Sequence, residues 1–130
     1  MTKHLPDGGY RPPHPVMCTE ELGDFPWPTE GLPGLSRIHV ALRYDKRGLV
    51  HYSISQQWRA DNVSAWQNVF RIDTSDGSLH FHRFKRDGTD EKGLIQELPI
   101  DGRDIVNGSY DESYTRVHNG MDERLRGWLK

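Results

Sequence analysis

Residues 66–88 read WQNVFRIDTSDGSLHFHRFKRDG, and this stretch decides the predicted fold. Residues 66–73 alternate large apolar with polar side chains, and residues 79–84 do much the same. This period of two is typical of half-buried strands. The Asp76-Gly77 pair between them suits a two-residue turn, because glycine adopts a positive φ without steric cost. The stretch therefore predicts a β-hairpin.

An even loop fixes which side chains share a face of this hairpin. With a two-residue turn, Asp73 faces His80 and Arg71 faces His82. A four-residue loop slides these pairs by two positions but keeps the faces. We expect one face to be exposed to solvent, and it carries Arg71, Asp73, His80 and His82. The other is the core face, and it carries Trp66, Phe70, Ile72, Leu79 and Phe81.

The polar face of the hairpin has residue types that suit acid–base chemistry. A carboxylate opposite an imidazole favours the charged ring and fixes its tautomer. An arginine supplies a permanent cation for an anionic substrate. The candidate catalytic residues are therefore His80, His82, Arg71 and Asp73. The alternative interpretation is an ordinary solvated face, on which oppositely charged cross-strand pairs are common.

A second hairpin precedes the first. Residues 38–44 alternate apolar with polar side chains, and residues 45–48 form a turn that ends in glycine. A three-residue loop with a glycine bulge keeps the apolar residues of both strands on one face. Those of the second strand are Val50, Tyr52 and Ile54.

The polar faces of the two hairpins meet if both belong to one sheet. His39, Arg43 and His51 then support the candidate catalytic residues from the same face. Grouped imidazoles raise the question of a metal, but the chain has no HxxxH or HExxH spacing. We therefore expect no metal and no other cofactor, and a metal-dependent reaction ranks last among the functional hypotheses.

The C-terminal residues predict an amphipathic helix. Ser109 followed by Glu112 forms a capping box, which places the start of the helix at Ser109. An apolar residue then recurs every three or four positions, and this stripe suits a helix that covers the apolar face of the sheet. Gly120 falls off the stripe, so we expect one continuous helix. The stripe comprises Tyr110, Tyr114, Val117, Met121, Leu125 and Trp128.

The remaining stretches complete the expected organisation. Residues 1–35 hold seven of the eight prolines, so we expect an extended arm without regular strand pairing, from which Phe25 and Trp27 pack onto the domain. Residues 94–98 predict a short fifth strand. The fold class is therefore α+β: an antiparallel sheet of four to five strands in two consecutive hairpins, covered by a C-terminal amphipathic helix, with a Pro-rich N-terminal arm. We expect a single domain over residues 36–130.

Composition limits the classes of function. The chain has 130 residues, a net charge of −2 and one cysteine. This length favours one domain, and the weak negative charge argues against a general nucleic-acid binder or a reader of DNA grooves. A single cysteine excludes an intramolecular disulfide. No apolar run approaches about 20 residues, and the N-terminus lacks the apolar core of a signal peptide. We therefore expect a cytoplasmic protein without a membrane partner.

The hairpin also carries a resemblance to a known group of proteins. An Arg71-x-Asp73 pattern, a turn and then a His80-x-His82 pattern resemble the TumE-like toxin families of bacterial and phage toxin–antitoxin systems, and related uncharacterised families. The resemblance is sharpest over residues 66–84. It implies an α+β fold, action on RNA or translation, and an antitoxin as partner.

Two functional hypotheses follow. The first is a small toxin-like module that acts on RNA as a ribonuclease without a metal, with histidines as base and acid and with Arg71 or Arg43 balancing the charge at phosphorus. The alternative is a non-enzymatic protein-binding accessory module of a phage or mobile element, with a host protein as partner. The overall acidity favours the alternative, and the Arg/Asp/His grouping favours the first.

Overall fold

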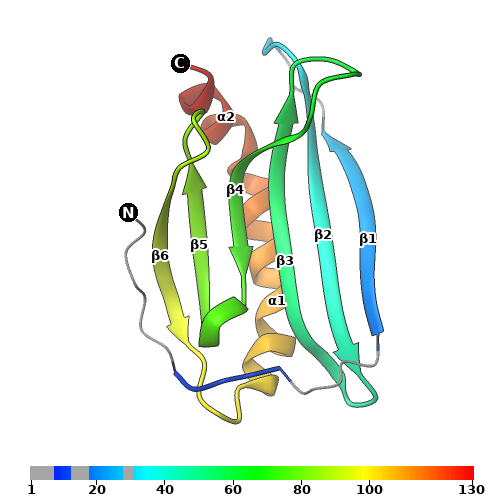
Figure 1. The fold of residues 1–130 in the computed structure, drawn as a ribbon, viewed down its shortest axis with the longest axis vertical. Helices are drawn as coiled ribbons and strands as arrows, with labels where there is room; N and C mark the ends of the chain where they lie inside the picture. Colours follow the sequence, from blue (N-terminus) through cyan, green and yellow to red (C-terminus); the bar gives the residue numbers. More distant parts are fainter. Residues whose placement is uncertain (1–7, 13–17, 28–30) are drawn as a thin grey trace.

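The computed structural model describes residues 8–12, 18–27 and 31–130. They form one antiparallel sheet whose strands lie in sequence order, and a pair of helices follows the last strand (Figure 1). The predicted α+β fold, with an antiparallel sheet and a C-terminal helical cover, is confirmed. The strands are β1 Cys18–Trp27, β2 Leu35–Asp45, β3 Gly48–Arg59, β4 Gln67–Asp73, β5 Ser78–Phe84 and β6 Asp90–Glu97. The helices are α1 Arg103–Asn119 and α2 Met121–Leu129, and a 3₁₀ turn, η1, spans Ser75–Gly77.

Over the described residues the sheet has six strands, one more than the largest number predicted. The additional strand is β1, which lies within the Pro-rich stretch and pairs with β2. The expectation of an arm without regular pairing is therefore wrong for Cys18–Trp27. Within β1 the only proline is Pro26, and β1 is an edge strand, where a missing N–H group is tolerated. The parts of the predicted arm at residues 1–7, 13–17 and 28–30 lie outside the described residues.

Trp27 packs onto the domain, as expected. Its indole Nε1 donates a hydrogen bond to Asp122 Oδ1 at 3.1 Å. Its ring lies edge-on to that of His118, with the ring centroids 4.5 Å apart. The end of β1 therefore reaches the junction of the two helices. The side chain of Phe25, the other aromatic residue of this prediction, lies outside the part of the structure that is described.

The core lies between the sheet and the helices, and α1 runs along the covered face of the sheet (Figure 1). The predicted core positions Phe70, Ile72 and Leu79 are buried, and the half-buried Phe81 packs against them. The main cluster of buried residues comprises Tyr10, Ile38, Val40, Tyr52, Ile54, Phe70, Ile72, Leu79, Leu98, Val106, Val117 and Met121. A second cluster joins the sheet to α2 and comprises Trp58, Val69, Leu125 and Trp128.

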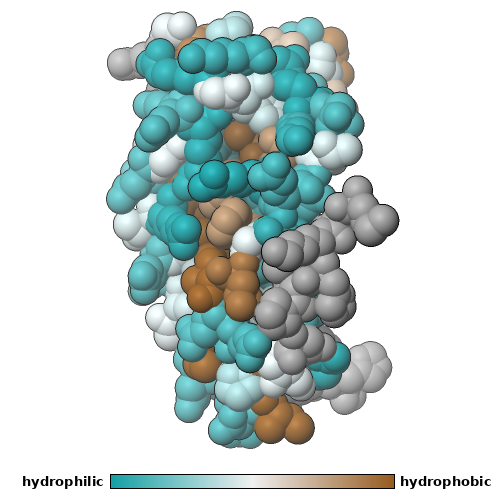
Figure 2. Space-filling model, turned by 90° about the vertical axis from the view of Figure 1, so that its left-hand side faces the viewer, coloured by the Kyte–Doolittle hydropathy of each residue, from teal (hydrophilic) through white to brown (hydrophobic). Residues whose placement is uncertain are grey.

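The β6 edge of the sheet differs in character from the core. Figure 2 faces the side of the molecule on which β6 lies, and it shows an apolar patch in the middle, with hydrophilic residues above and below it. Leu94 of β6 is 40% exposed. Among the strands that the structure describes, β6 pairs only with β5, so its outer edge is left without a strand partner.

The register of the β4–β5 hairpin is the predicted one, with Asp73 opposite His80. The turn residues have positive φ, 57° at Asp76 and 74° at Gly77. These are the values that an Asp-Gly hairpin turn requires. The β2–β3 hairpin has a two-residue loop, with Asp45 opposite Gly48 and a bulge at Val50, so the predicted three-residue loop with a glycine bulge is wrong. The predicted apolar residues of β3 are nonetheless buried together: Val50, Tyr52 and Ile54. Local turn chemistry therefore sets the register of the β4–β5 hairpin.

A β-bulge in β4 moves Trp66 off the predicted core face. The register between β3 and β4 shifts at Val69, which falls between two ladder pairs. An extra residue changes the alternation of faces, so Val69 and Phe70 are both buried. Trp66 lies instead against Arg37 and Arg59, whose guanidinium carbons are 4.2 and 4.4 Å from its ring centroid. The prediction that Trp66 belongs to the core is wrong.

The helix begins earlier than predicted. α1 starts at Arg103 after an N-cap at Gly102, so Ser109 lies inside the helix and the capping-box prediction is wrong. A Ser-x-x-Glu pattern also occurs inside helices, where the serine hydroxyl bonds to another group instead of capping the helix N-terminus. Here Ser109 Oγ lies 2.7 Å from Tyr52 Oη, which ties α1 to β3. Among the described residues, neither helix is long and apolar enough to cross a lipid bilayer.

The prediction of one continuous helix is also wrong. Gly120 has non-helical dihedral angles, φ −102° and ψ 6°, and it separates α1 from α2. The guanidinium of Arg124 donates to the carbonyl oxygens of Val117 and Arg116, both at 2.8 Å. These carbonyls belong to the last turn of α1, which otherwise lacks donors. A side chain thus caps α1 from the next helix.

Gly93 and Gly108 allow a matched test of the packing. Gly93 lies under the ring of Phe81, its partner in β5, and an added Cβ would collide with that ring. At Gly108 in α1 an added Cβ meets nothing within 4 Å. We expect Gly93→Ala to lower the free energy of unfolding by about 1–3 kcal/mol. We expect Gly108→Ala to raise it by about 0.5–1 kcal/mol. Urea unfolding measures both, and equal stability of the two variants would contradict the ring position.

Candidate functional site

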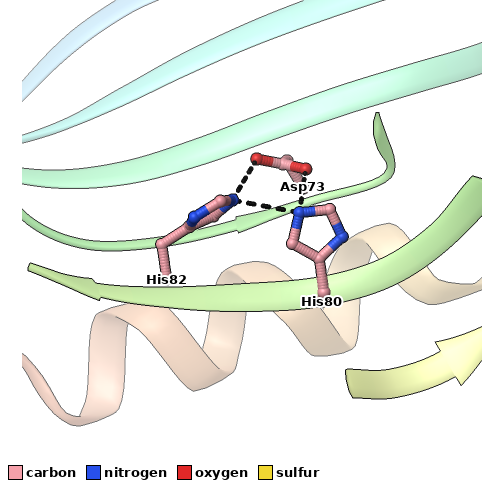
Figure 3. A group of neighbouring side chains, drawn as sticks. All are labelled: Asp73, His80 and His82. Carbon is pink, nitrogen blue, oxygen red and sulfur yellow. Dashed lines mark hydrogen bonds and ion pairs between the residues drawn. The ribbon is translucent and has the colours of Figure 1, made fainter. Parts of the chain in front are cut away.

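Three predicted site residues converge on the face of the sheet that points away from the helices (Figure 3). Asp73 is the last residue of β4, and His80 and His82 lie two positions apart on β5. Strand alternation therefore places all three on one side, opposite the core residues between them. We call these three residues the Asp–His–His cluster.

The polar atoms of the Asp–His–His cluster lie close to one another. His80 Nε2 is 3.0 Å from Asp73 Oδ1, and His82 Nε2 is 3.3 Å from Asp73 Oδ2. The two Nε2 atoms are 3.0 Å apart. Among the described residues, this is the only group of three or more His, Cys, Asp or Glu side chains that converge in this way.

The outer ring nitrogens of the cluster also have partners. His80 Nδ1 lies 3.1 Å from the carbonyl oxygen of Ser78, and His82 Nδ1 lies 2.7 Å from Asp90 Oδ2. A carboxylate oxygen only accepts, so the Nδ1–H of His82 donates to Asp90, whereas His80 Nδ1 also lies 3.0 Å from Ser78 Oγ, which can donate or accept. The main-chain N–H and the hydroxyl of Ser75 donate to Asp73 Oδ1 at 3.0 and 2.7 Å. All three side chains are therefore held from outside the cluster.

The cluster is buried, so the expectation of a solvent-exposed face is wrong at these positions. The exposed fraction is 4% for Asp73, 1% for His80 and 7% for His82. Side chains on adjacent strands stand about 5 Å apart. Here they turn toward one another and toward the neighbouring hydrogen-bonding groups, so each shields the next from water.

Burial and pairing act in opposite directions on the pKa values of the cluster. Burial acts to raise the pKa of Asp73, but pairing with His80 and His82 outweighs it and holds that pKa well below its usual range. Burial acts to lower the pKa of His82, but pairing with Asp73 and Asp90 leaves it raised. The carboxylate is therefore ionised at neutral pH.

Arg71 lies beside the cluster but is not part of it. It pairs with His82 across the ladder, as predicted. Its Nε donates to Ser55 Oγ at 3.1 Å, and its guanidinium carbon is 5.3 Å from the ring centroid of Phe84. Arg71 thus places a positive charge next to the more exposed histidine.

The predicted supporting residues share the face but not the cluster. His51 Nδ1 lies 2.9 Å from Thr74 Oγ1, and burial lowers the pKa of this histidine. His39 and Arg43 lie on β2, two strands away from β4. The structure therefore brings Asp73 together with His80 and His82. The other two histidines of this face, His39 and His51, lie outside the cluster.

Sequence reasoning missed Asp90. The sequence predicts a fifth strand only over residues 94–98, whereas β6 begins at Asp90, after the Asp87-Gly88 turn, and pairs it with Phe84. The Asp-Gly pair was the available signal, because a hairpin turn there directs the next strand back along β5.

A pocket of about 230 Å³ opens next to the cluster. Trp66 and Phe84 form aromatic walls, and Lys85 and Arg86 add positive charge. The ring of Phe84 also stacks on that of His82, with centroids 5.8 Å apart and an angle of 17° between the planes. Phe84 is therefore a wall that the pocket and the cluster share.

Comparison with known proteins gives one result. A family model described as a domain of unknown function (DUF7718) matches residues 26–106, more than half of the chain. The matched range includes the Asp–His–His cluster. No curated protein and no solved structure matches the chain. The chain therefore belongs to the DUF7718 family.

Proposed function

We propose that this member of the DUF7718 family binds single-stranded RNA at the pocket between Trp66 and Phe84 and cleaves it at the Asp–His–His cluster. The observation that carries the proposal is the shared wall. Phe84 lines the pocket and stacks on His82, the most exposed member of the cluster. An RNA base in the pocket would therefore lie next to the reacting groups.

Charge and aromatic surface support the binding step. Proteins hold single strands with cations along the backbone and with aromatic rings on which bases stack. The pocket has two aromatic walls and two cations of its own. The charged side chains that β2, β3 and β4 place on this face include Arg37, Arg43, Arg59 and Arg71. Such a local group of cations is compatible with a net charge of −2.

The cluster supplies a base for the cleavage step. Because its Nδ1–H is donated to Asp90, neutral His82 keeps a lone pair on Nε2. This lone pair would take the proton of a 2′-hydroxyl while the 2′ oxygen attacks the adjacent phosphorus. The bond to the 5′ oxygen breaks, this oxygen takes a proton from water, and a 2′,3′-cyclic phosphate remains. Arg71 would balance the negative charge at phosphorus. The resemblance to TumE-like toxins supports the same activity.

Phe84→Ala should weaken the binding of a short single-stranded RNA about tenfold, because stacking of one base contributes about 1–3 kcal/mol. Fluorescence anisotropy with a labelled oligonucleotide measures this. Arg83→Ala is the matched control, since it removes a cation from the opposite face of the same strand. A similar loss in both variants, or no loss at Phe84, would contradict the assignment of the pocket.

Cleavage is followed with the same oligonucleotide by gel electrophoresis. The parent chain should cut the RNA but leave its 2′-deoxy counterpart intact, and His82→Gln should cut neither. Thermal melting establishes that the variant is folded. Cleavage of the deoxy strand, or by folded His82→Gln, would contradict the proposed role of His82.

A protein partner is the second candidate, and the outer edge of β6, which has no strand partner among the described residues, favours it. The exposed Leu94 lies on β6, and Figure 2 shows an apolar patch on the side of the molecule where β6 lies. An extended segment of an antitoxin or a host protein would add to β6 as a further strand. In that case the purified chain binds no RNA, and His82→Gln retains its effect in cells.

A further inference from the structure

The geometry points to a second property of the Asp–His–His cluster: it is a binding site for one first-row transition-metal cation such as Zn²⁺. The ligands are His80 Nε2, His82 Nε2 and the carboxylate of Asp73. This inference concerns the folded chain itself, and it stands whether or not the chain cleaves RNA.

Three ligand atoms face one another in the cluster. The Nδ1–H of His82 is directed at Asp90, so this ring in its neutral form carries its lone pair on Nε2. His80 Nδ1 lies 3.1 Å from the carbonyl oxygen of Ser78 and 3.0 Å from Ser78 Oγ, and the tautomer that donates Nδ1–H to either oxygen also has its lone pair on Nε2. Both Nε2 atoms point at the Asp73 carboxylate and at each other. The centre of the cluster is thus lined by electron-pair donors.

Protons on the rings satisfy only some of these contacts. Each Nε2 holds at most one hydrogen. If both rings carry one, two N–H groups oppose each other across 3.0 Å. If only one ring carries it, the lone pair of the other faces a carboxylate oxygen at 3.0 or 3.3 Å. A single cation between the three groups makes every contact favourable.

The distances between the donor atoms fit a bound cation. Zinc lies about 2.0–2.1 Å from histidine nitrogen and about 2.0–2.2 Å from carboxylate oxygen. At bond angles from right-angled to tetrahedral, two such ligands are about 2.8–3.5 Å apart. The three distances in the cluster are 3.0, 3.0 and 3.3 Å. All three sides of the ligand triangle therefore have the required length.

The surroundings of the cluster also suit a metal. Histidines that bind metals donate their other N–H to a carboxylate or a backbone carbonyl, which fixes the ring. Asp90 and the Ser78 carbonyl fill these roles, and Ser75 holds the carboxylate of Asp73. Two imidazoles and one carboxylate favour Zn²⁺, Fe²⁺ or Co²⁺ over Mg²⁺ and Ca²⁺, which prefer oxygen ligands. Three protein ligands leave a position for water.

The test is a titration of the full chain after removal of metals with EDTA and dialysis. Calorimetry should give a stoichiometry of one Zn²⁺ per chain, bound at the Asp–His–His cluster. Zn²⁺ at 100 times its Kd should raise the Tm by about 10 °C, and MgCl₂ at the same concentration should leave the Tm unchanged. A Tm that does not move with Zn²⁺ would overturn the inference, and this measurement needs no variant.

Variants locate the binding. His82→Gln should weaken Zn²⁺ binding by at least 100-fold, and Asp90→Asn should weaken it by about tenfold, because Asp90 acts through the ring of His82. His118→Gln, on α1 and away from the cluster, should bind like the parent. Unchanged affinity in His82→Gln would overturn the site.

One consequence rests on the proposed function. A cation takes the same lone pair of His82 that RNA cleavage requires, so Zn²⁺ should slow cleavage over the concentration range in which calorimetry detects binding. Zn²⁺ binding by a chain that cleaves no RNA would remove the proposed function and leave the metal site. Cleavage by a chain that binds no Zn²⁺ would do the reverse.

Discussion

His80→Ala should lower the free energy of unfolding by about 3–5 kcal/mol. The His80 side chain is 1% exposed and pairs with Asp73 Oδ1. Its removal leaves the ionised carboxylate buried with one partner fewer, and the loss of one partner from a buried pair has a cost of this size. Urea unfolding followed by tryptophan fluorescence measures the change.

Arg83→Ala is the matched control for this experiment. Arg83 lies on the same strand, but it is exposed and points to the opposite face, where it lies 5.3 Å from the ring centroid of Phe81. Its loss should change the free energy of unfolding by less than about 1 kcal/mol. A His80→Ala variant as stable as Arg83→Ala would show that the cluster is exposed, as the sequence predicts.

Phe70→Ala should cost about 3–5 kcal/mol of unfolding free energy. The ring is 2% exposed and stacks on Phe81 at a centroid distance of 5.9 Å. The guanidinium carbon of Arg124 lies 3.8 Å from its centroid. Burial, with the like charges of Arg116 and Arg83, lowers the pKa of Arg124 to about 10. Removing the ring therefore leaves a cavity and also deprives a half-buried cation of its aromatic partner.

Phe84→Ala provides the comparison on the other face of the sheet. Phe84 is half-buried and lines the open pocket, so its loss should cost about 1 kcal/mol. Thermal or urea unfolding of the two variants tests which face of β4 and β5 is covered. Equal losses would contradict the assignment of faces, and a small loss at Phe84 makes its RNA-binding result readable on a folded chain.

The parts of the fold that local chemistry controls could be predicted from the sequence. The Asp76-Gly77 turn and the alternation on both sides of it are enough to set the register of Asp73 and His80. The bulge at Val69 could not be predicted, because the sequence Val69-Phe70 is the same whether both residues pair regularly or one of them is inserted as a bulge. β1 could not be predicted either, because its proline is tolerated only at an edge, and edge position is a property of the whole sheet.

The candidate site was predictable to the same extent. Alternation alone places Asp73, His80 and His82 on one face, and the structure brings them together. Their burial depends on groups that come from elsewhere in the chain, above all Asp90 of β6. A carboxylate among other charges gives no sign in the sequence that it has a buried partner. The exclusion of Arg71 from the cluster follows from its bond to Ser55, which is likewise a long-range contact.

The strand order has a consequence for the chain as it is being synthesised. Each strand pairs with the one made just before it, so the sheet can assemble stepwise as the chain leaves the ribosome. The helices that cover its apolar face are made after β6, the last strand in the part of the chain that the structure describes. At about 5–20 residues per second, the nascent sheet exposes that face for about a few seconds before α1 and α2 arrive. Translation that stopped at Glu97 would release a chain that contains β1 to β6 but lacks both helices. The apolar face of its sheet would then be exposed to chaperones and to neighbouring chains.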